Sequence, residues 1–374
     1  MQTKPYPERL PAPASHLETL PPYTPIEPFE VLSARLGREP ERIIKLDANE
    51  NPYGPSPRVL RALGELRFAH IYPDPESRLL RAELAKFTGV PMDYLLAGAG
   101  ADELIDLFLR MVLELGDAVI ICPPTFGMYA FDTHVNGGQV IEVRRKPDLS
   151  LDIEAIREAV RNYRPKALFL ATPNNPDGSL PIAKELDELL ELPTFIVLDE
   201  AYIEFTGQGL LGEMATRISE VPQRDNLIVL RTFSKWAGLA GLRVGYGAFP
   251  GWLMPTLWKA KQPYNVNVAA SSAAIHSLED VDYLAEVVGR LRAERERLYT
   301  SLQKISFLRP YPSQANFILC QVLEREAAHL KKTLATEYGI LVRYFDQPGL
   351  QDHIRISVGR PEDSEALLQA FEKV

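Results

Sequence analysis

The stretch NLIVLRTFSKWAGLAGLRVGY, from Asn226 to Tyr246, contains the pattern that decides the fold. It begins with the apolar run Asn226 to Leu230 and continues into polar and small residues around Lys235. Short runs rich in Val, Ile and Leu that end at turn residues are typical of strands buried on both faces of a sheet. A lone lysine after such a strand is usually a solvated surface charge. Lys235 instead lies among Ser, Thr, Phe and small apolar residues, where a lysine amine can form an imine.

Three more runs of this kind lie upstream: DAVIICP from Asp117 to Pro123, KALFLAT from Lys166 to Thr172, and TFIVLD from Thr194 to Asp199. Amphipathic stretches such as Asp102 to Leu115 and Asp152 to Tyr163 lie between the runs. This alternation predicts an α/β fold with a mostly parallel sheet flanked by helices on both faces. Ligands bind beyond the carboxyl ends of the strands in such sheets, so the residues just after each run are the candidates for a site.

A chain of 374 residues is too long for one core of ordinary size, and we expect two domains. We expect residues 1–42 to form a proline-rich arm that leads into a helix from about Pro28 to Gly37, and we expect this arm and helix to join the small domain. Residues 43–267 form the large domain. The pattern changes after Pro263, so residues 268–374 form a smaller α+β domain. The elements predicted there are a charged helix from Glu279 to Lys304, strands at Asn316 to Val322, Ile340 to Tyr344 and His353 to Val358, and a terminal helix.

Composition excludes several classes of protein. The formal net charge is -9, which argues against a nucleic-acid binder with a broad basic face. The two cysteines, Cys122 and Cys320, form neither a disulfide framework nor a paired metal motif, so we expect no metal site. No apolar run reaches membrane-spanning length, and the N-terminus lacks the apolar stretch of a signal peptide. We therefore expect a cytoplasmic enzyme with no membrane partner.

The residues after the strands supply four kinds of chemical group. GAGADE, from Gly98 to Glu103, opens a helix whose free N–H groups can face an anion, although it lacks the third glycine of a dinucleotide fingerprint and a plain tight turn explains it equally well. Asn175 and Asp199 each follow a strand and have ordinary explanations as a turn residue and a capping residue. Together these groups offer an imine-forming amine, a carboxylate for a ring nitrogen, donors for a phenolate oxygen and a nest for a phosphate. Pyridoxal 5'-phosphate (PLP) chemistry needs that set.

The sequence resembles the fold-type-I PLP-dependent aminotransferases over nearly its whole length, and within them it is most similar to the histidinol-phosphate aminotransferases. The residues that carry the resemblance are Tyr23 in PPYTP, LDANENPYGPSP from Leu46 to Pro57, Tyr72-Pro73-Asp74, GAGADELI, CPPTFGMY, PNNPDG, LDEAYIEF, RTFSKWAGLAGLRVGY, Arg343 in ILVRYF and Arg355 in HIRISVG.

The resemblance implies that Lys235 is the catalytic residue and carries the cofactor as a Schiff base. It implies that Asp199 pairs with the pyridine nitrogen, that Asn175 and Tyr202 bind the phenolate oxygen, and that Phe126 stacks on the ring. The implied phosphate contacts are the N–H groups of Ala101 and Asp102, the side chains of Thr232, Ser234 and Arg243, and Tyr53 from a second subunit. A homodimer with shared active sites follows from the last of these.

The same resemblance implies the substrate. Arg355 is the family's anion-binding arginine, and with Arg343 and Tyr23 it would hold the phosphate of L-histidinol phosphate. The implied reaction is transamination with 2-oxoglutarate, which gives imidazole acetol phosphate and glutamate in histidine biosynthesis. Without the resemblance, Arg343 and Arg355 would be taken for solvated charges at strand ends.

Two positions depart from the family pattern. Asp177 replaces the Thr of the usual Asn-Pro-Thr-Gly turn, and Phe126 stands where many relatives have Tyr. The first leaves the role of Asn175 intact, whereas the second keeps the stacking and loses a hydroxyl.

Three other functions remain open. The first is an aminotransferase for aromatic or other amino acids, and the second is a PLP-dependent phosphothreonine-type decarboxylase. The third is a non-catalytic regulator, which would need a DNA-binding module longer than the arm before Ile43. A nicotinamide oxidoreductase is disfavoured by the missing glycine.

Overall fold

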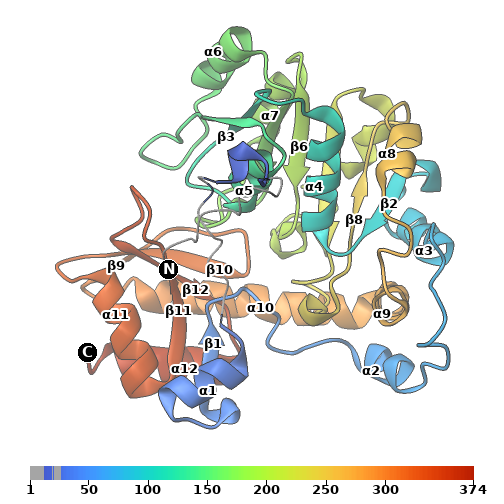
Figure 1. Cartoon of the computed structure of the whole chain (residues 1–374). Helices are drawn as coiled ribbons and strands as arrows, with labels where there is room; N and C mark the ends of the chain where they lie inside the picture. The colour runs from blue at the N-terminus through green and yellow to red at the C-terminus, as the bar shows by residue number, and fades with distance from the viewer. Residues whose placement is uncertain (1–11, 19, 21–26) are drawn as a thin grey trace.

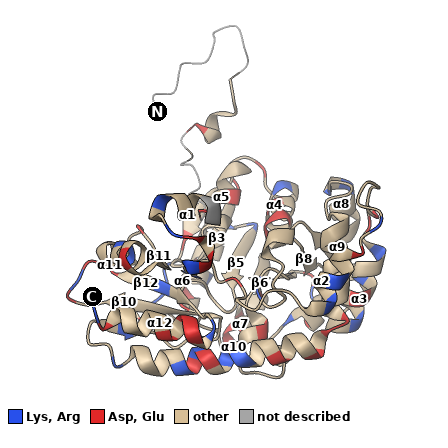
Figure 2. Ribbon diagram, turned by 90° about the horizontal axis from the view of Figure 1, so that it is seen from below, with Lys and Arg blue, Asp and Glu red and all other residues tan. Residues whose placement is uncertain are grey.

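The structure is a computed structural model that describes residues 12–18, 20 and 27–374. The chain forms two β-sheets, and the long helix α10 (Val281–Leu302) runs beside both of them (Figure 1). Acidic and basic residues are interspersed along α10, as the colours of the ribbon in Figure 2 show, and Arg290 pairs with Glu286 one turn away. In the described residues no helix is long and apolar enough to cross a membrane.

The first sheet has seven strands in the order β2-β8-β7-β6-β5-β3-β4. Its strands are β2 (Leu95–Gly98), β3 (Ala118–Ile121), β4 (Gln139–Glu142), β5 (Ala167–Ala171), β6 (Phe195–Asp199), β7 (Leu227–Thr232) and β8 (Gly245–Ala248). Neighbouring strands from β4 to β7 run parallel, and β8 runs antiparallel to both of its neighbours. The predicted, mostly parallel sheet is therefore confirmed.

Both faces of this sheet are buried, which explains the nearly continuous apolar runs in the sequence. On β5, Leu168 and Leu170 pack on one face, and Phe169 and Ala171 pack on the other. The face that carries Phe169 is covered by α4 (Ala101–Val112), α5 (Met128–Val135) and α8 (Met254–Ala260). The opposite face is covered by α2 (Pro57–Gly64), α3 (Arg78–Thr88), α6 (Ile153–Tyr163), α7 (Ala183–Leu190), α9 (Val268–Leu278) and the first half of α10.

The second sheet has five strands in the order β1-β11-β12-β10-β9. Its elements are β1 (Ile44–Leu46), β9 (Leu308–Pro310), β10 (Phe317–Val322), β11 (Ile340–Tyr344) and β12 (His353–Ser357), with helices α1 (Phe29–Leu36), α11 (Ala327–Thr333) and α12 (Pro361–Phe371). The predicted helix of the arm matches α1, which ends at Gly37 in the left-handed conformation with a φ of 60°.

Two elements pair or pack across the predicted domain boundaries. The boundary at residue 43 assigned Ile44–Leu46 to the large domain, whereas this strand pairs in parallel with β11 of the second sheet. The boundary at residue 267 separated α9 from the helices α2 and α3 that it packs against. A strand of three residues is too short to show a periodicity, and the sequence of α9 does not say which sheet it covers.

Candidate active site

A cavity of about 360 Å³ lies beyond the carboxyl ends of β5, β6 and β7, at the N-terminus of α4. It brings together ten of the predicted site residues: Ala101, Asp102, Phe126, Asn175, Asp199, Tyr202, Thr232, Ser234, Lys235 and Arg243. A larger groove of about 860 Å³ beside Gly178 and Arg217 has no lysine in its lining. The smaller cavity is therefore the one that places Lys235 with the carboxylate of Asp199 and the amide of Asn175.

One end of the cavity is suited to bind a phosphate group. The first N–H groups of α4 point out of the helix at Ala101 and Asp102, and the hydroxyls of Thr232 and Ser234 lie together at 2.9 Å. Arg243 donates to Asp102 Oδ2 at 2.9 Å and to Ser234 Oγ at 3.4 Å. A helix N-terminus, two hydroxyls and a guanidinium make a complete set of donors for an anion.

Two glycines allow this end of the cavity to be so narrow. Gly100 precedes α4 with a φ of 86°, and a Cβ there would lie 2.6 Å from Nη2 of Arg243. Gly245 on β8 packs against the start of the same helix, where a Cβ would lie 2.7 Å from the backbone nitrogen of Ala101. Any larger residue at position 245 would push α4 away from the sheet.

Asp199, at the end of β6, is the buried carboxylate of the cavity. Its Oδ2 accepts from the Tyr129 hydroxyl at 2.6 Å, and its Oδ1 accepts from the backbone N–H of Ala201 at 3.1 Å. Burial raises the pKa of Asp199 to about 6, and the hydrogen bond from Tyr129 opposes that rise. A protonated ring nitrogen next to Asp199 would favour its ionised form.

Tyr129 is a site residue that the sequence did not assign. Its motif, CPPTFGMY, was recognised, but an aromatic three residues after Phe126 looks like core, and Tyr129 is indeed fully buried. Burial and the neighbouring charge of Asp199 raise the pKa of Tyr129 well above its usual value, so its hydroxyl stays a donor. Only the hydrogen bond to Asp199 shows that it belongs to the site.

Lys235 extends into the cavity, although the residue is only partly buried. Its Nζ donates to the backbone oxygen of Ala48 at 3.1 Å and lies 5.9 Å from the centre of the Tyr202 ring. Tyr202 lies 6% exposed between this amine and the second sheet, where its ring packs edge-on against Phe317. The amine and the Asp199 carboxylate thus face one space.

The two predicted anion-binding arginines are direct cross-strand neighbours, Arg343 on β11 and Arg355 on β12. Both guanidinium groups lie against the ring of Phe345, at 5.8 Å and 5.6 Å from its centre. Arg355 also donates to Asn175 Oδ1 at 2.5 Å and to the backbone oxygen of Asp47 at 2.8 Å. Arg355 therefore joins the second sheet to a residue of the cavity wall.

Of the predicted site residues that the structure describes, three do not line the cavity within one chain: Tyr53, Arg343 and Arg355. Tyr53 is partly buried, and its ring lies 5.4 Å from the guanidinium carbon of Arg360 and 5.9 Å from that of Arg290. The assignment of Tyr53 to the site of a second subunit stays a prediction. Tyr23 lies outside the described residues.

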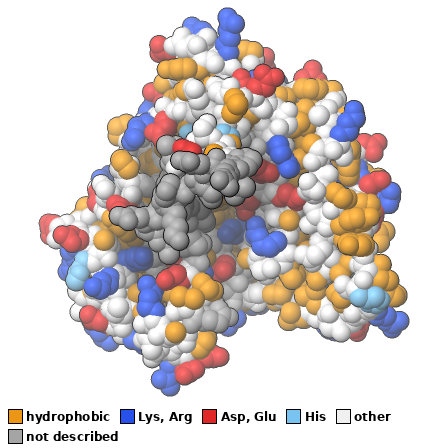
Figure 3. All heavy atoms as spheres, in the orientation of Figure 1, with side chains coloured by type: hydrophobic (Ala, Val, Ile, Leu, Met, Phe, Trp, Pro, Cys, Tyr) orange, Lys and Arg blue, Asp and Glu red, His pale blue; other side chains and the backbone are white. Residues whose placement is uncertain are grey.

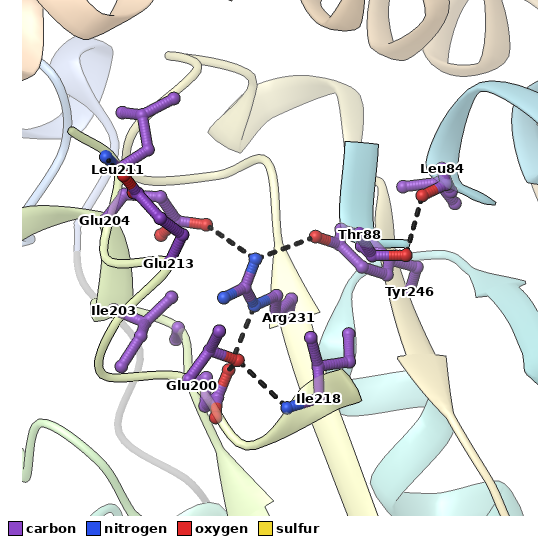
Figure 4. Close-up of polar contacts among 12 residues, drawn as sticks. Leu84, Thr88, Glu200, Ile203, Glu204, Leu211, Glu213, Ile218, Arg231 and Tyr246 are labelled. Atoms are coloured by element: carbon purple, nitrogen blue, oxygen red, sulfur yellow. Dashed lines mark hydrogen bonds and ion pairs between the residues drawn. The ribbon is translucent and has the colours of Figure 1, made fainter. Parts of the chain in front are cut away.

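Behind the cavity, on the opposite face of the same strands, is a buried polar cluster formed by Glu200, Glu204, Arg231 and Tyr246 (Figure 4). Arg231 Nε donates to Glu200 at 3.0 Å, and the Arg231 Nη1 atom lies 3.4 Å from the Tyr246 hydroxyl. Thr216 and the backbone of Arg217 also donate to Glu200. At the end of β6, Asp199 thus faces the cavity and Glu200 faces this cluster. At the end of β7, Thr232 faces the cavity and Arg231 faces the cluster, because successive side chains of a strand point to opposite faces.

Comparison with known proteins agrees with this geometry. The family model for class I and II aminotransferases matches residues 41–371. The chain belongs to this family. It is 55% identical to the chloroplastic histidinol-phosphate aminotransferase of Nicotiana tabacum, over 95% of this chain and 85% of that protein. It is 50% identical to histidinol-phosphate aminotransferase from Roseiflexus castenholzii, over 96% of both chains.

Among solved structures, histidinol-phosphate aminotransferase from Sinorhizobium meliloti in complex with PLP superimposes with a TM-score of 0.87 at 28% identity. The match covers 98% of this chain and 97% of that chain. The predicted family and fold class are therefore confirmed. PLP is the cofactor of this family of aminotransferases, and the cavity has the groups to hold it: donors for a phosphate at one end, a buried carboxylate for a ring nitrogen, and Lys235 for the aldehyde.

Proposed function

We propose that this chain transfers the amino group of L-histidinol phosphate to 2-oxoglutarate, giving imidazole acetol phosphate and glutamate. The observation that carries the proposal is one cavity in which Lys235 lies with Asp199, Asn175 and Tyr202, next to a pair of arginines. Relatives at 50–55% identity over nearly the whole chain bear the name of that enzyme, which supports the choice of substrate.

The protein's own residues would divide the chemistry between them. Bound PLP supplies an electron sink for the charge left on the substrate Cα. Lys235 Nζ would take the proton from the substrate Cα and hold it for its return. Asp199, buried and hydrogen-bonded by Tyr129, would keep the ring nitrogen protonated, and Asn175 and Tyr202 would orient the ring through its oxygen. Phe126 lines the same cavity, where it would cover one face of the ring and help to exclude water.

Arg343 and Arg355 would bind the anionic group of each substrate. Like charges directly opposite each other in an antiparallel pair repel, so this cross-strand pair is stabilised by any anion that binds between the two groups. A phosphate can accept from both guanidinium forks, and the carboxylates of 2-oxoglutarate can use the same forks in the second half-reaction. The arginine pair thus accounts for both substrates with one site.

The test is an amino-donor panel on purified protein with PLP, run with 2-oxoglutarate as acceptor. Histidinol phosphate should be the best donor, ahead of phenylalanine and of other amino acids. Lys235→Ala should abolish transamination, while Lys259→Ala, a change of an exposed lysine on α8, should leave it unchanged. Substantial transamination by Lys235→Ala would refute the catalytic assignment. A phenylalanine preference, or release of carbon dioxide without 2-oxoglutarate, would replace the substrate assignment with one of the two enzymatic alternatives.

We further propose a homodimer that shares its active sites. Large apolar side chains are exposed around α2, α3 and the segment between them: Leu60, Phe68, Ile71, Tyr72 and Leu79, with Tyr264 stacked on Tyr72 at 4.7 Å. Tyr72 alone is 80% exposed. Hydrophobic side chains gather on this side of the molecule in Figure 3. A contiguous apolar surface of this kind marks a protein–protein interface.

Subunit mixing tests the shared site. In the proposed dimer each active site takes Lys235 from one subunit and Tyr53 from the other. Lys235→Ala and Tyr53→Ala should therefore each inactivate both sites of a dimer made of that variant alone. A mixed dimer of the two variants should therefore contain one site with both residues intact, and activity should reappear when the inactive variants are refolded together. A monomer by sedimentation, or mixtures no more active than the separate variants, would refute the shared site.

We keep the cytoplasm as the proposed location, since both cysteines are buried and unpaired.

A further inference from the structure

We propose that Asn49, held in place by Ser357, is a positioning residue that keeps the Tyr202 hydroxyl oriented as a hydrogen-bond donor toward the cofactor. The inference rests on the proposed function, because that function assigns Tyr202 to the ring oxygen of PLP. The three residues come from distant parts of the chain: the loop after β1, the turn after β6 and the end of β12. All three are buried, with exposed fractions of 1% for Asn49, 6% for Tyr202 and 2% for Ser357.

The direction of the contact between Asn49 and Tyr202 is fixed by its chemistry. Asn49 Nδ2 lies 3.0 Å from the Tyr202 hydroxyl oxygen, and an amide nitrogen can only donate. The tyrosine oxygen therefore accepts, and its own proton is left for another acceptor. Within the described part of the chain no protein group takes that proton, and Tyr202 lines the cofactor cavity. The proton is thus available to an oxygen of the cofactor.

Ser357 fixes which way the Asn49 amide points. Its Oγ accepts from the backbone N–H of Asn49 at 2.8 Å, and its own proton is donated to Asn49 Oδ1 at 2.9 Å. With Oδ1 held by this bond, Nδ2 must face Tyr202. If the amide turned over, Oδ1 would face Tyr202 and would draw the tyrosine proton away from the cavity. The serine therefore decides the polarity of the whole hydrogen-bond chain.

The second sheet also holds the backbone of Asn49. Asn49 has a φ of 57°, in the left-handed region that asparagine tolerates better than most residues. Asn316, just before β10, donates to the backbone oxygen of Asn49 at 2.9 Å. Three hydrogen bonds thus tie Asn49 to the second sheet, and its side chain passes that constraint to Tyr202. The position of the second sheet is in this way coupled to the orientation of the Tyr202 hydroxyl, which faces the cofactor cavity.

The expected consequence is electrostatic. A donor to the ring oxygen stabilises negative charge on that oxygen. Loss of the donor should therefore raise the pKa of the bound cofactor. The midpoint of the cofactor's pH-dependent absorbance change should then move to higher pH. The charged groups that face this space stay the same in every variant: Lys235, Asp199, Asp102, Glu50 and Arg243, with Arg355 reached through Asn175.

A double-mutant cycle on the PLP-loaded protein tests the inference without any substrate. The absorbance of the unchanged protein, Asn49→Ala, Tyr202→Phe and the double variant is recorded against pH. Asn49→Ala should raise the midpoint by about half a unit to one unit, as expected for one neutral hydrogen bond. In the Tyr202→Phe background the same change should add no further shift. Asn226→Ala is the matched control, because Asn226 donates to three backbone carbonyls at the opposite end of β7.

An unshifted midpoint in Asn49→Ala, or an equal shift in both backgrounds, would overturn the inference, since Asn49 would then not act through Tyr202. Ser357→Ala is a second route should Asn49→Ala fold poorly, and it should give a smaller shift in the same direction. Thermal unfolding of each variant without PLP separates loss of folding from loss of orientation. Failure of the proposed function would look different, because the unchanged protein would then show no pH-dependent PLP absorbance or would not use histidinol phosphate.

Discussion

Two arginines twelve residues apart, Arg231 and Arg243, form ion pairs of nearly the same length in opposite surroundings. Arg231 pairs with Glu200 at 3.0 Å, and the two side chains are 4% and 1% exposed. Arg243 pairs with Asp102 at 2.9 Å, and the two side chains are 47% and 44% exposed. The first pair lies behind the seven-stranded sheet, and the second lies at the mouth of the cofactor cavity.

Burial determines what each pair can do. A buried guanidinium has lost its water and depends on its partners, so removing one partner leaves an uncompensated charge. An exposed pair contributes little to stability, because water and salt screen it. Arg243 can therefore be released from Asp102 to meet a phosphate at small cost. We infer that the Arg231 cluster holds the ends of β6 and β7 in place, while Arg243 serves the ligand.

The largest expected effect comes from breaking the buried pair. Arg231→Met leaves Glu200 buried without its cation and should destabilise the fold by about 3–5 kcal/mol. Thermal or urea unfolding of the protein without PLP measures this loss. Arg231→Met combined with Glu200→Gln removes both charges and should recover part of the stability. A single variant as stable as the unchanged protein would show that the cluster does not hold the strand ends.

Changing the exposed pair should weaken PLP binding and leave the stability of the fold nearly unchanged. Arg243→Gln should change the unfolding midpoint little, but it removes a charged donor to the phosphate and should weaken PLP binding by about 10- to 100-fold. Titration of the protein with PLP, followed by absorbance, measures the affinity. Arg110→Gln is the matched control, because Arg110 is equally exposed and pairs with Asp106 near the other end of α4. Unchanged PLP affinity in Arg243→Gln would contradict the assignment of the phosphate site.

The cavity side of this comparison could be predicted from the sequence, because several of the cavity residues lie at or just after the end of an apolar run. Strand ends of a parallel sheet meet at one edge, so Asn175, Asp199 and Lys235 could be grouped before any coordinates were known. The buried side could not be predicted in the same way. Glu200 and Arg231 lie in the recognised motifs, but nothing local shows that the short turn after β6 brings Glu204 back toward Arg231.

Other features depend on registers and distances that a pattern does not carry. The pairing of Arg343 with Arg355 requires the alignment of two strands, and the bond from Tyr129 to Asp199 joins residues 70 positions apart. Strand β1 is three residues long, and β8 reads GYGA, so neither has enough apolar residues to show a strand pattern. Asn49 lay within a recognised motif, yet its contact with Ser357 spans 308 positions.

The smallest expected effect concerns Glu204, the second acid of the buried cluster. Burial raises the pKa of Glu204 to about 8, while a glutamate in an unfolded chain titrates near ~4.3. Between these pH values the folded protein binds a proton that the unfolded chain does not, so the contribution of Glu204 to stability is lost as the pH rises from about 5 to about 8. Glu204→Gln cannot lose a proton in this way. Its stability relative to the unchanged protein should therefore increase with pH over that range, as measured by thermal unfolding at a series of pH values. A difference that stays constant from pH 5 to pH 8 would mean that Glu204 is ionised beside Arg231, and that the buried cluster carries two negative charges against one positive charge.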